Sequence, residues 1–506
     1  MNASTAALRT LWRAAHAAGD HGRALAALEQ ALALAPLDAG LWTTFAELLL
    51  ELGRAGEALR AAESALALAP QEAHAVIAAA NAANACGDGV RAEALLRGLL
   101  AREPHATAAR ANLASLYERA NRYDEAEREA REGLKVAPGH PLLNFVVAEC
   151  AFHRRDLDLC DMYLGRIRNA AGLIPQHAAY LAAQLLAARG RHAEAYAAFG
   201  AANRIAAAHA ERLGQRPEAH LEQLRDERSI FSAGWVAGWS ALAPPAPLPF
   251  VPAFLVGFPR SGTTLLEQIL DAHPGVAAIE EQAFLEQRFL DQARTYPHWL
   301  ADLDRDAHER VRAQYATSVL AHRPDAAGRV LLDKLPLRLA QAGAVQRLFP
   351  EARFLFALRH PYDVVLSCFM QELQPNPAMT NFYSLEGAAR FYDLVMSMWA
   401  QHRAQLPLSV VTVRYEALVD DLEAEVRPAL AHLGLDWDPQ VAAFAEHARS
   451  RRIRTPSYSQ VSKGLYSSAR ARFVEYLPQF SAEVRALLDP WVERWGYTPV
   501  NSRDIG

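Results

Sequence analysis

The sequence predicts a chain in two parts: an α-helical solenoid, then an α/β domain built on a doubly wound parallel sheet. Three observations predict this architecture. A 34-residue repeat runs through the first half of the 506 residues, and a proline-rich stretch near residue 245 then interrupts the period. After that stretch, short apolar runs alternate with helical patterns. The composition, 51% hydrophobic and 22% charged, is that of a globular protein with two or three domains.

Three independent classes of residue mark the repeat. Prolines, glycines and small residues each recur every 34 positions. They are Pro36, Pro70, Pro104 and Pro138; Gly19, Gly53 and Gly87, continued in phase by Asn121 and Arg155; and Ala24, Ala58, Ala92, Ala126 and Cys160. Each unit is expected to be two helices, the first ended by the glycine and the second by the proline. The small residue stands where the two helices approach closely. Because one such hairpin cannot bury its own apolar face, neighbouring units must stack.

This pattern resembles the tetratricopeptide repeat, with about six units over residues 5–211. The fifth unit is irregular, since its proline, Pro175, follows Pro138 by 37 residues instead of 34. Two uses of such an array stay open. One is a concave surface for a peptide or protein partner, and the other is a spacer that stiffens the chain or holds it as a homodimer.

Residues 212–252 are expected to form a linker. Residues 212–243 have the pattern of one or two helices, and ALAPPAPLPFVP then imposes extended structure. We place the domain boundary at residues 244–252 and the α/β domain at residues 253–506.

The α/β domain is predicted to open with a strand, a glycine-containing turn and a helix. The strand is Ala253–Val256 and the helix is Thr263–Ala272, with its leucines and isoleucine on one side. The turn between them, GFPRSGTT, aims backbone N–H groups at one point and adds the charge of Arg260, which suits a phosphate. A nucleoside-triphosphate loop would need a lysine after Gly262, so the magnesium chemistry of that motif is not encoded.

A second anion site is predicted further along the chain. Val330–Leu332 and Phe354–Leu358 have the pattern of buried parallel strands, joined by a crossover helix over Leu337–Phe349. Arg359 ends the second strand, and Ser367 follows on the next helix, so both can converge on a phosphate. A later strand is expected to end at Arg414-Tyr415-Glu416.

These motifs together resemble the sulfotransferase family, and most closely its protein-tyrosine sulfotransferase branch. The matching order is PRSGTTLLEQILDAHP, a Glu-Glu pair, DKLP, ALRHPYDVVLSCF and VRYEAL, over roughly residues 250–480. Repeats placed before such a domain also resemble a known bacterial arrangement. The resemblance implies transfer of a sulfuryl group from 3′-phosphoadenosine 5′-phosphosulfate (PAPS) to an acceptor hydroxyl, without a metal.

The resemblance also implies a role for individual residues. The 5′-phosphosulfate would be cradled by Arg260, Ser261, Gly262, Thr263 and Thr264, the 3′-phosphate bound by Arg359 and Ser367, and the adenine contacted by Tyr415. Lys334 and Arg260 would act on the leaving phosphate and the sulfuryl group, and Glu281, 21 residues after Arg260, would be the general base. Ser459 and Lys463 resemble a late nucleotide-contacting segment. His273 is expected to be a structural turn residue.

The chain departs from the branch at three positions. Ala283 and Gln287 stand where tyrosylprotein sulfotransferases carry arginines that bind acidic peptides, and Gln371 replaces a further phosphate-binding arginine. Peptide tyrosine, a saccharide hydroxyl and a small alcohol therefore all stay open as acceptors. Two other function classes are a protein-binding scaffold with an inactive sulfotransferase-like domain, and an ATP-dependent kinase on a related fold.

The net charge and the cysteine content limit which binding partners and which cellular compartment the sequence favours. A net charge of −5 gives no bulk attraction to nucleic acid or anionic membranes. The four cysteines show no metal-ligand spacing, which favours a reducing compartment. We expect no secretion signal at the N-terminus, no membrane span, and a cytoplasmic protein.

Overall fold

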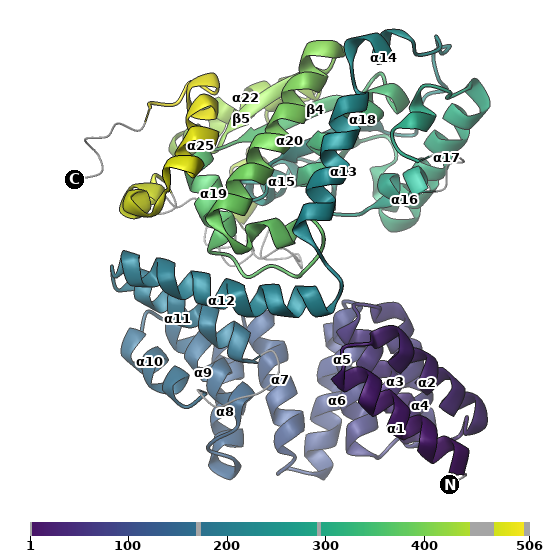
Figure 1. Ribbon diagram of the computed structural model, residues 1–506, viewed down its shortest axis with the longest axis vertical. Coiled ribbons are helices and arrows are strands. Elements are labelled where there is room, and N and C mark those ends of the chain that lie inside the picture. Colours follow the sequence, from purple (N-terminus) through teal and green to yellow (C-terminus); the bar gives the residue numbers. More distant parts are fainter. Residues whose placement is uncertain (1–2, 168–173, 291–294, 446–469, 500–506) are drawn as a thin grey trace. The chain divides into compact units, whose positions relative to one another are not determined.

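The computed structural model describes residues 3–167, 174–290, 295–445 and 470–499 (Figure 1). The chain divides into two compact units, Met1–Gly214 and Gln215–Gly506. None of the helices within the described ranges is long and apolar enough to cross a membrane.

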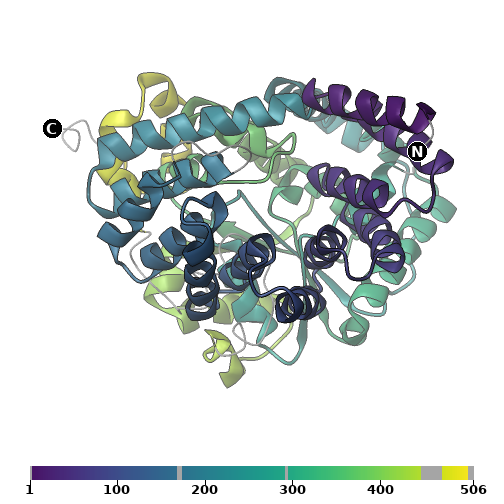
Figure 2. The same ribbon diagram turned by 90° about the horizontal axis from the view of Figure 1, so that it is seen from below.

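The first unit is an α-solenoid whose described helices form six successive pairs. They are α1 (Ala3–Ala17), α2 (His21–Leu34), α3 (Ala39–Glu51), α4 (Ala55–Leu68), α5 (Ala73–Ala85), α6 (Gly89–Arg102), α7 (Thr107–Arg119), α8 (Tyr123–Val136), α9 (Pro141–His153), α10 (Leu157–Gly165), α11 (Ile174–Ala188) and α12 (His192–Arg212). The pairs follow one another in a curved row (Figure 2).

The 34-residue period has the structural meaning that the sequence predicts. Gly19, Gly53 and Gly87 all have positive φ, between 72° and 94°, at the turn inside each pair. Asn121 and Arg155 hold the same left-handed conformation in the next two pairs, with φ of 57° and 64°. The small residues Ala24, Ala58, Ala92, Ala126 and Cys160 are all buried to 1% exposure or less. Pro175 differs from the expectation: it does not end a helix but lies in the first turn of α11, where proline costs no intrahelical hydrogen bond.

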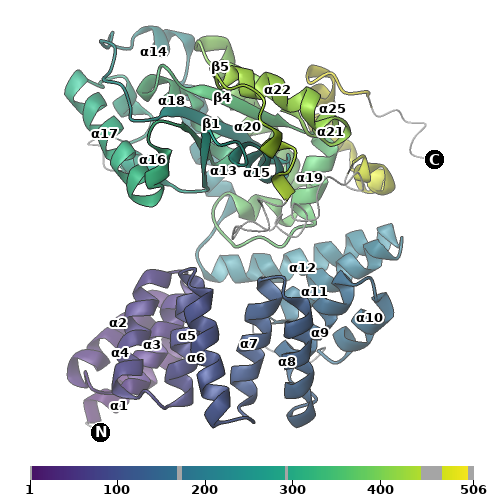
Figure 3. The same ribbon diagram turned by 180° about the vertical axis from the view of Figure 1, so that it is seen from behind.

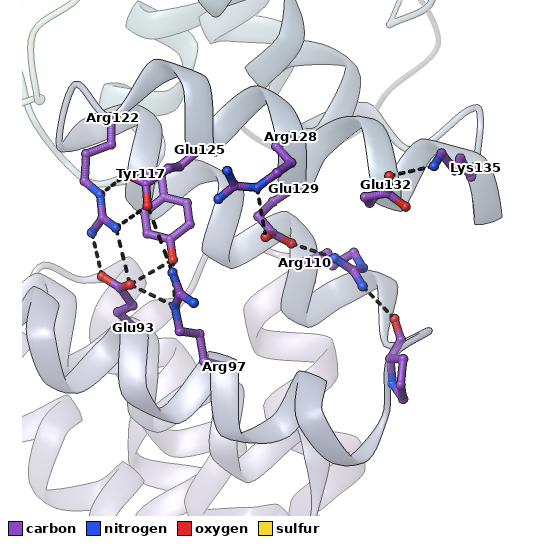
Figure 4. A network of polar contacts seen from close by, with 11 residues as sticks. Glu93, Arg97, Arg110, Tyr117, Arg122, Glu125, Arg128, Glu129, Glu132 and Lys135 are labelled. Carbon is purple, nitrogen blue, oxygen red and sulfur yellow. Dashed lines mark hydrogen bonds and ion pairs between the residues drawn. The ribbon is translucent and has the colours of Figure 1, made fainter.

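Arginine and glutamate side chains link successive helices of the array (Figure 4). Arg122, at the start of α8, contacts Glu93 of α6 at 2.6 Å and Glu125 of α8 at 2.5 Å. The phenol of Tyr117 on α7 donates to Glu93 at 2.9 Å, and the Arg122 guanidinium lies 4.2 Å from the centre of the Tyr117 ring. These side chains therefore connect three consecutive helices.

The second unit begins with α13 (Pro217–Ile230) and α14 (Ala233–Ala237). The expected boundary lies at the proline-rich segment, and the structure groups the preceding residues, from Gln215 onward, with the second unit. The reason is packing: the Phe231 ring lies edge-on to His402 of α20 (Leu385–Gln405), with centroids 4.7 Å apart. A Cβ on Gly343 would come within 2.4 Å of the same ring. A segment that the sequence predicts to be a linker therefore covers apolar surface of the second unit.

The sheet of the second unit has five parallel strands in the order β2-β3-β1-β4-β5. The strands are β1 (Val251–Gly257), β2 (Val276–Glu280), β3 (Val330–Lys334), β4 (Arg353–Leu358) and β5 (Ser409–Arg414). The sequence-based prediction includes no strand at the position of β2, although VAAI is a short apolar run. The last strand was predicted too long, because Tyr415 begins helix α21 (Tyr415–Asp420).

Helices cover both faces of the sheet (Figure 3). One face packs against α15 (Thr263–Asp271) and α22 (Leu422–His432), and the other against α17 (Arg305–His322), α18 (Ala342–Leu348) and α20. The single crossover helix expected over residues 337–349 is instead a 3₁₀ segment, Pro336–Gln341, followed by α18. Helix α15 is buried on every side, whereas the sequence suggested one apolar face.

Candidate active site

The turn after β1 is shaped by glycine and by close contacts. Gly262 has φ of 90° at the start of α15, and a Cβ there would lie 2.6 Å from the Tyr415 ring. A Cβ on Gly257 would lie 2.6 Å from the carbonyl oxygen of Ala357 on β4. Side chains larger than glycine would therefore displace β4 or Tyr415. The first turn of α15 adds backbone N–H groups that have no acceptor within the helix.

Two arginines and a hydroxyl meet at this turn. The Nε of Arg260 donates to the Oγ of Ser367 at 3.1 Å, and Arg359 donates to the carbonyl oxygen of Arg260 at 3.1 Å. Ser367 lies on α19 (Pro361–Phe369), which follows β4 and Arg359 as expected. The Arg359 guanidinium also lies 4.7 Å from the centre of the Tyr415 ring. Positive charge, hydroxyl groups and a helix N-terminus at one point suit an anion.

Buried acids hold the arginine side of this cluster in place. Asp363 lies 3.8 Å from Arg359 and accepts the backbone N–H groups of Ala471 and Phe473 at 2.8 and 2.9 Å. Burial raises the pKa of Asp363, and the Arg359 charge opposes that rise. Burial, and then Arg359, lower the pKa of His360 to about 4, so His360 is neutral near pH 7.

Lys334 ends β3 with its side chain fully buried among three carboxylates. Its Nζ lies 2.8 Å from Glu281, 3.1 Å from Glu267 and 3.6 Å from Glu280. Burial is the largest effect on its pKa and favours the neutral amine. The charges of Glu267, Glu281 and Glu280 outweigh burial and raise the pKa of Lys334 above its ordinary value. Lys334 therefore keeps its proton at neutral pH.

Glu281 differs from its two neighbours because its side chain is 43% exposed. Its backbone has φ of 48° and is held by a hydrogen bond from its N–H to the carbonyl oxygen of Lys334 at 2.8 Å. Outside glycine and asparagine, a left-handed backbone costs on the order of 1–2 kcal/mol, and such strain gathers at functional sites. The same conformation occurs at Arg260, with φ of 71°.

A second buried ion-pair group braces the segment that carries Glu281. Arg338, fully buried, lies 2.7 Å from Asp333 of β3 and donates to Glu286 of α16 (Phe284–Leu290) at 2.8 Å. It also donates to the carbonyl oxygen of Gln282 at 3.2 Å. Arg338 thus connects Asp333, which precedes Lys334, with Gln282, which follows Glu281.

The structure brings most of the expected residues together. Ser261, Thr263 and Thr264 are buried in the turn, and Arg359, Ser367 and Tyr415 lie beside it. Ser459 and Lys463 fall outside the described residues. Ala283 and Gln287 are exposed. His273 is structural, since its ring nitrogens bond the N–H of Gly275 and the carbonyl oxygen of Asp436.

Sequence reasoning missed the acids that surround the cations. Glu267, Asp333 and Asp363 were not singled out, and neither was Arg338; Glu280 was noted only as the partner of Glu281 in the Glu-Glu pair. The sequence could have indicated Glu267, because this acid interrupts the apolar stretch TTLLEQIL directly after the turn that follows β1. It could also have indicated Asp333, as an acid at the end of an apolar strand.

Comparison with known proteins identifies the second unit. Residues 252–439 match the model of the sulfotransferase family. This chain carries a sulfotransferase-family domain. The match runs from Pro252 in β1 to beyond β5 and includes residues 257–264, Glu281, Lys334 and Arg359. Residues 15–82 and 83–150 match the tetratricopeptide repeat.

Individual relatives are similar to about half of this chain. Nodulation protein NoeE of Sinorhizobium fredii is 30% identical over 240 residues, covering 42% of this chain and 56% of that protein. A protein-tyrosine sulfotransferase of Drosophila melanogaster is 27% identical over 271 residues, covering 50% and 53%. An uncharacterized protein of Aquifex aeolicus is 27% identical over 48% of this chain and 34% of its own length. The chain thus spans between about a third and just over half of these relatives.

Proposed function

We propose that the chain is a PAPS-dependent sulfotransferase that acts on an acceptor hydroxyl. One observation carries the proposal most directly. A half-exposed carboxylate, Glu281, pairs with a buried lysine, Lys334, at the same edge of the sheet as the Arg260–Ser367–Arg359 cluster. A base, a fixed cation and an anion site are the three parts that this reaction needs.

The donor would bind through the turn and the two arginines. Residues 260–264 would hold the 5′-phosphosulfate with backbone N–H groups, hydroxyls and Arg260. Arg359 and Ser367 would hold the 3′-phosphate, and Tyr415 would contact the adenine. The close contact between Gly262 and Tyr415 supports this assignment, because only a residue without a Cβ lets the Tyr415 ring lie against the turn.

Transfer would be an in-line displacement at sulfur. The acceptor oxygen forms a bond to sulfur while the bond between sulfur and the 5′-phosphate oxygen breaks, as in phosphoryl transfer. Glu281 takes the acceptor proton, and the negative charge that develops on the leaving phosphate is stabilised by Lys334 and Arg260. Glu267, 2% exposed and 3.1 Å from Lys334, keeps the lysine paired after Glu281 becomes neutral.

The first experiment tests the donor. Thermal unfolding of the full chain is followed with 3′,5′-adenosine bisphosphate and, separately, with Mg-ATP. We expect stabilisation by the bisphosphate alone. Stabilisation by Mg-ATP alone would favour the kinase, and stabilisation by neither would favour the inactive scaffold.

The second experiment finds the acceptor. Labelled PAPS is offered with a tyrosine peptide, an oligosaccharide and a small alcohol, and transfer is compared between the native chain and Glu281→Gln. We expect label on one class only, and only with the native chain. Equal transfer by both proteins would contradict the assignment of the base.

The repeats and the compartment belong to the same proposal. The array would bring a protein or peptide acceptor to the domain, or hold two copies of the chain together. The four cysteines are all unpaired, which suits a cytoplasmic, reducing environment.

A further inference from the structure

Three side chains capable of binding a metal lie together at one end of the first repeat. His16 is in the last turn of α1, His21 is the first residue of α2, and Glu51 is the last residue of α3. One ligand atom from each lies within 4.8 Å of the other two. No other group of this kind occurs among the residues that the structure describes.

The repeat geometry places these residues together. The turn at Gly19, with φ of 75°, reverses the chain so that the end of α1 lies beside the start of α2. The first helix of the second repeat, α3, ends at the equivalent turn before Gly53. His16 and Glu51 are one period plus one residue apart, so stacking of the two repeats brings them to 2.7 Å.

An ordinary ion pair between His16 and Glu51 does not account for the whole cluster. The ring of His21 lies 5.9 Å from that of His16, and its Nδ1 is buried with no hydrogen-bond partner within the described part of the chain. A buried imidazole nitrogen without a partner loses its hydration without compensation. A bound cation would supply the missing interaction.

We propose that His16, His21 and Glu51 bind one divalent transition-metal ion, for which Zn²⁺ is the best match. Two imidazoles and a carboxylate are a ligand set that zinc favours, with water in the fourth position. Zinc–ligand distances of about 2.0–2.2 Å put tetrahedral ligand atoms roughly 3.5 Å apart. The side chains of His16 and Glu51 are each 38% exposed, so rotation of these side chains can close the observed spread.

The site would join the first two repeats at their ends. It lies far in sequence from the sulfotransferase residues, and it does not depend on the proposed reaction. Helix α12 also reaches this region, because the charges of Glu51 and His21 act on the pKa of His209. Burial is the largest effect and lowers that pKa, as do the charges of Arg212 and His21, while Glu51 acts in the opposite direction. A metal would then stabilise the array rather than take part in sulfuryl transfer.

The test uses the full chain without a histidine tag, freed of metal by chelation. Isothermal titration with ZnCl₂ should show one equivalent bound, and MgCl₂ should show none. His16→Ala, His21→Ala and the isosteric Glu51→Gln should each weaken Zn²⁺ binding by more than about 10-fold. Zinc should raise the melting temperature of the native chain but not of these variants.

A matched control comes from the next repeat. His74 lies 3.0 Å from Glu72 in the same kind of histidine–glutamate pair, but no third ligand group adjoins it among the described residues. His74→Ala should therefore bind Zn²⁺ like the native chain. Absence of stoichiometric binding, undiminished binding by His16→Ala and Glu51→Gln, or an equal loss in His74→Ala would each overturn the proposal. Circular dichroism of the metal-free variants shows that any loss is not a loss of fold.

Discussion

The second unit contains fully buried ion pairs, whereas the ion pairs described in the repeat array are partly exposed. In the repeat array, Arg122 and Glu93 pair with side chains 38% and 22% exposed, on a surface that water reaches. In the sulfotransferase domain, Arg338 and Asp333 pair with neither side chain exposed, and Lys334 is as deeply buried. Surface pairs of the first kind contribute little and can be exchanged. Buried charges cost desolvation, so their presence at one edge of the sheet points to a task other than stability.

The same contrast holds for the backbone. In the array, left-handed residues recur at each helix turn, mostly as glycine, and they serve the repeat geometry. In the sulfotransferase domain, Arg260 and Glu281 adopt this conformation although both carry large side chains. Left-handed backbone follows from repetition in the array, whereas in the second unit two of its non-glycine instances, Arg260 and Glu281, coincide with the proposed chemistry. The following predictions test that difference.

Glu281→Gln should have the largest effect. Loss of a general base typically lowers turnover by about 10²–10⁴-fold, while affinity for 3′,5′-adenosine bisphosphate should stay nearly unchanged. Turnover is measured with labelled donor once the acceptor is known. Glu280→Gln, which also removes a carboxylate near Lys334, is the matched control and should retain most activity. Retention of more than a third of the native turnover by Glu281→Gln would reject it as the base.

Arg338→Met should destabilise the sulfotransferase domain by about 3–5 kcal/mol, because it leaves Asp333 buried without its cation. Urea unfolding of the full chain, followed by a probe in that domain, measures this loss. The double variant Asp333→Asn, Arg338→Met should recover part of it, since no unpaired charge remains. A loss below about 1 kcal/mol would show that the buried pair behaves like a surface pair.

Arg359→Ala should weaken binding of 3′,5′-adenosine bisphosphate by about 1.5–3 kcal/mol, the value of a hydrogen bond to a charged group. The analogue without the 3′-phosphate should bind almost as tightly as it does to the native chain. Titration calorimetry with both nucleotides separates the two cases. If both lost affinity equally, Arg359 would have a structural role only.

Arg122→Ala should cost the array about 1 kcal/mol or less, and less still in high salt. Its effect should also depend on pH. The hydrogen bond from Arg122 is the main cause that lowers the pKa of Glu93. The pair therefore stabilises the fold at pH values above the ordinary carboxyl pKa of 4.5, and this contribution is lost as the pH falls below 4.5 and Glu93 becomes protonated. Unfolding of native and variant chains at several pH values should show curves that converge in acid. A difference that grows in acid would contradict the assignment.

Removal of residues 1–214 should have the smallest effect on the donor site. All donor-site candidates lie after residue 250, and α13, which packs on the second unit, is kept. Affinity for 3′,5′-adenosine bisphosphate should change by no more than about threefold. Folded protein without nucleotide affinity would show that the array contributes to the site.

Much of this architecture follows from local sequence. The 34-residue period determined the helix pairs, because each glycine, alanine and proline satisfies a requirement met within one hairpin. The turn of residues 257–264 could also be predicted, since it lies between a strand and a helix and its proposed contacts to phosphate come largely from its own backbone. Arg359 and Ser367 could be paired because Arg359 directly follows a strand and Ser367 lies on the helix that comes next.

The surroundings of the charged residues, by contrast, depend on how distant segments pack. Lys334, Glu267 and Glu281 come from β3, α15 and the end of β2, and no local pattern shows that one ammonium group meets three carboxylates. The same holds for Arg338 with Asp333 and Glu286, and for Phe231 against α20. His16 and Glu51 meet only because two repeats stack. The physical reason is that burial and charge pairing depend on distances in space, which a chain fixes only when distant segments pack.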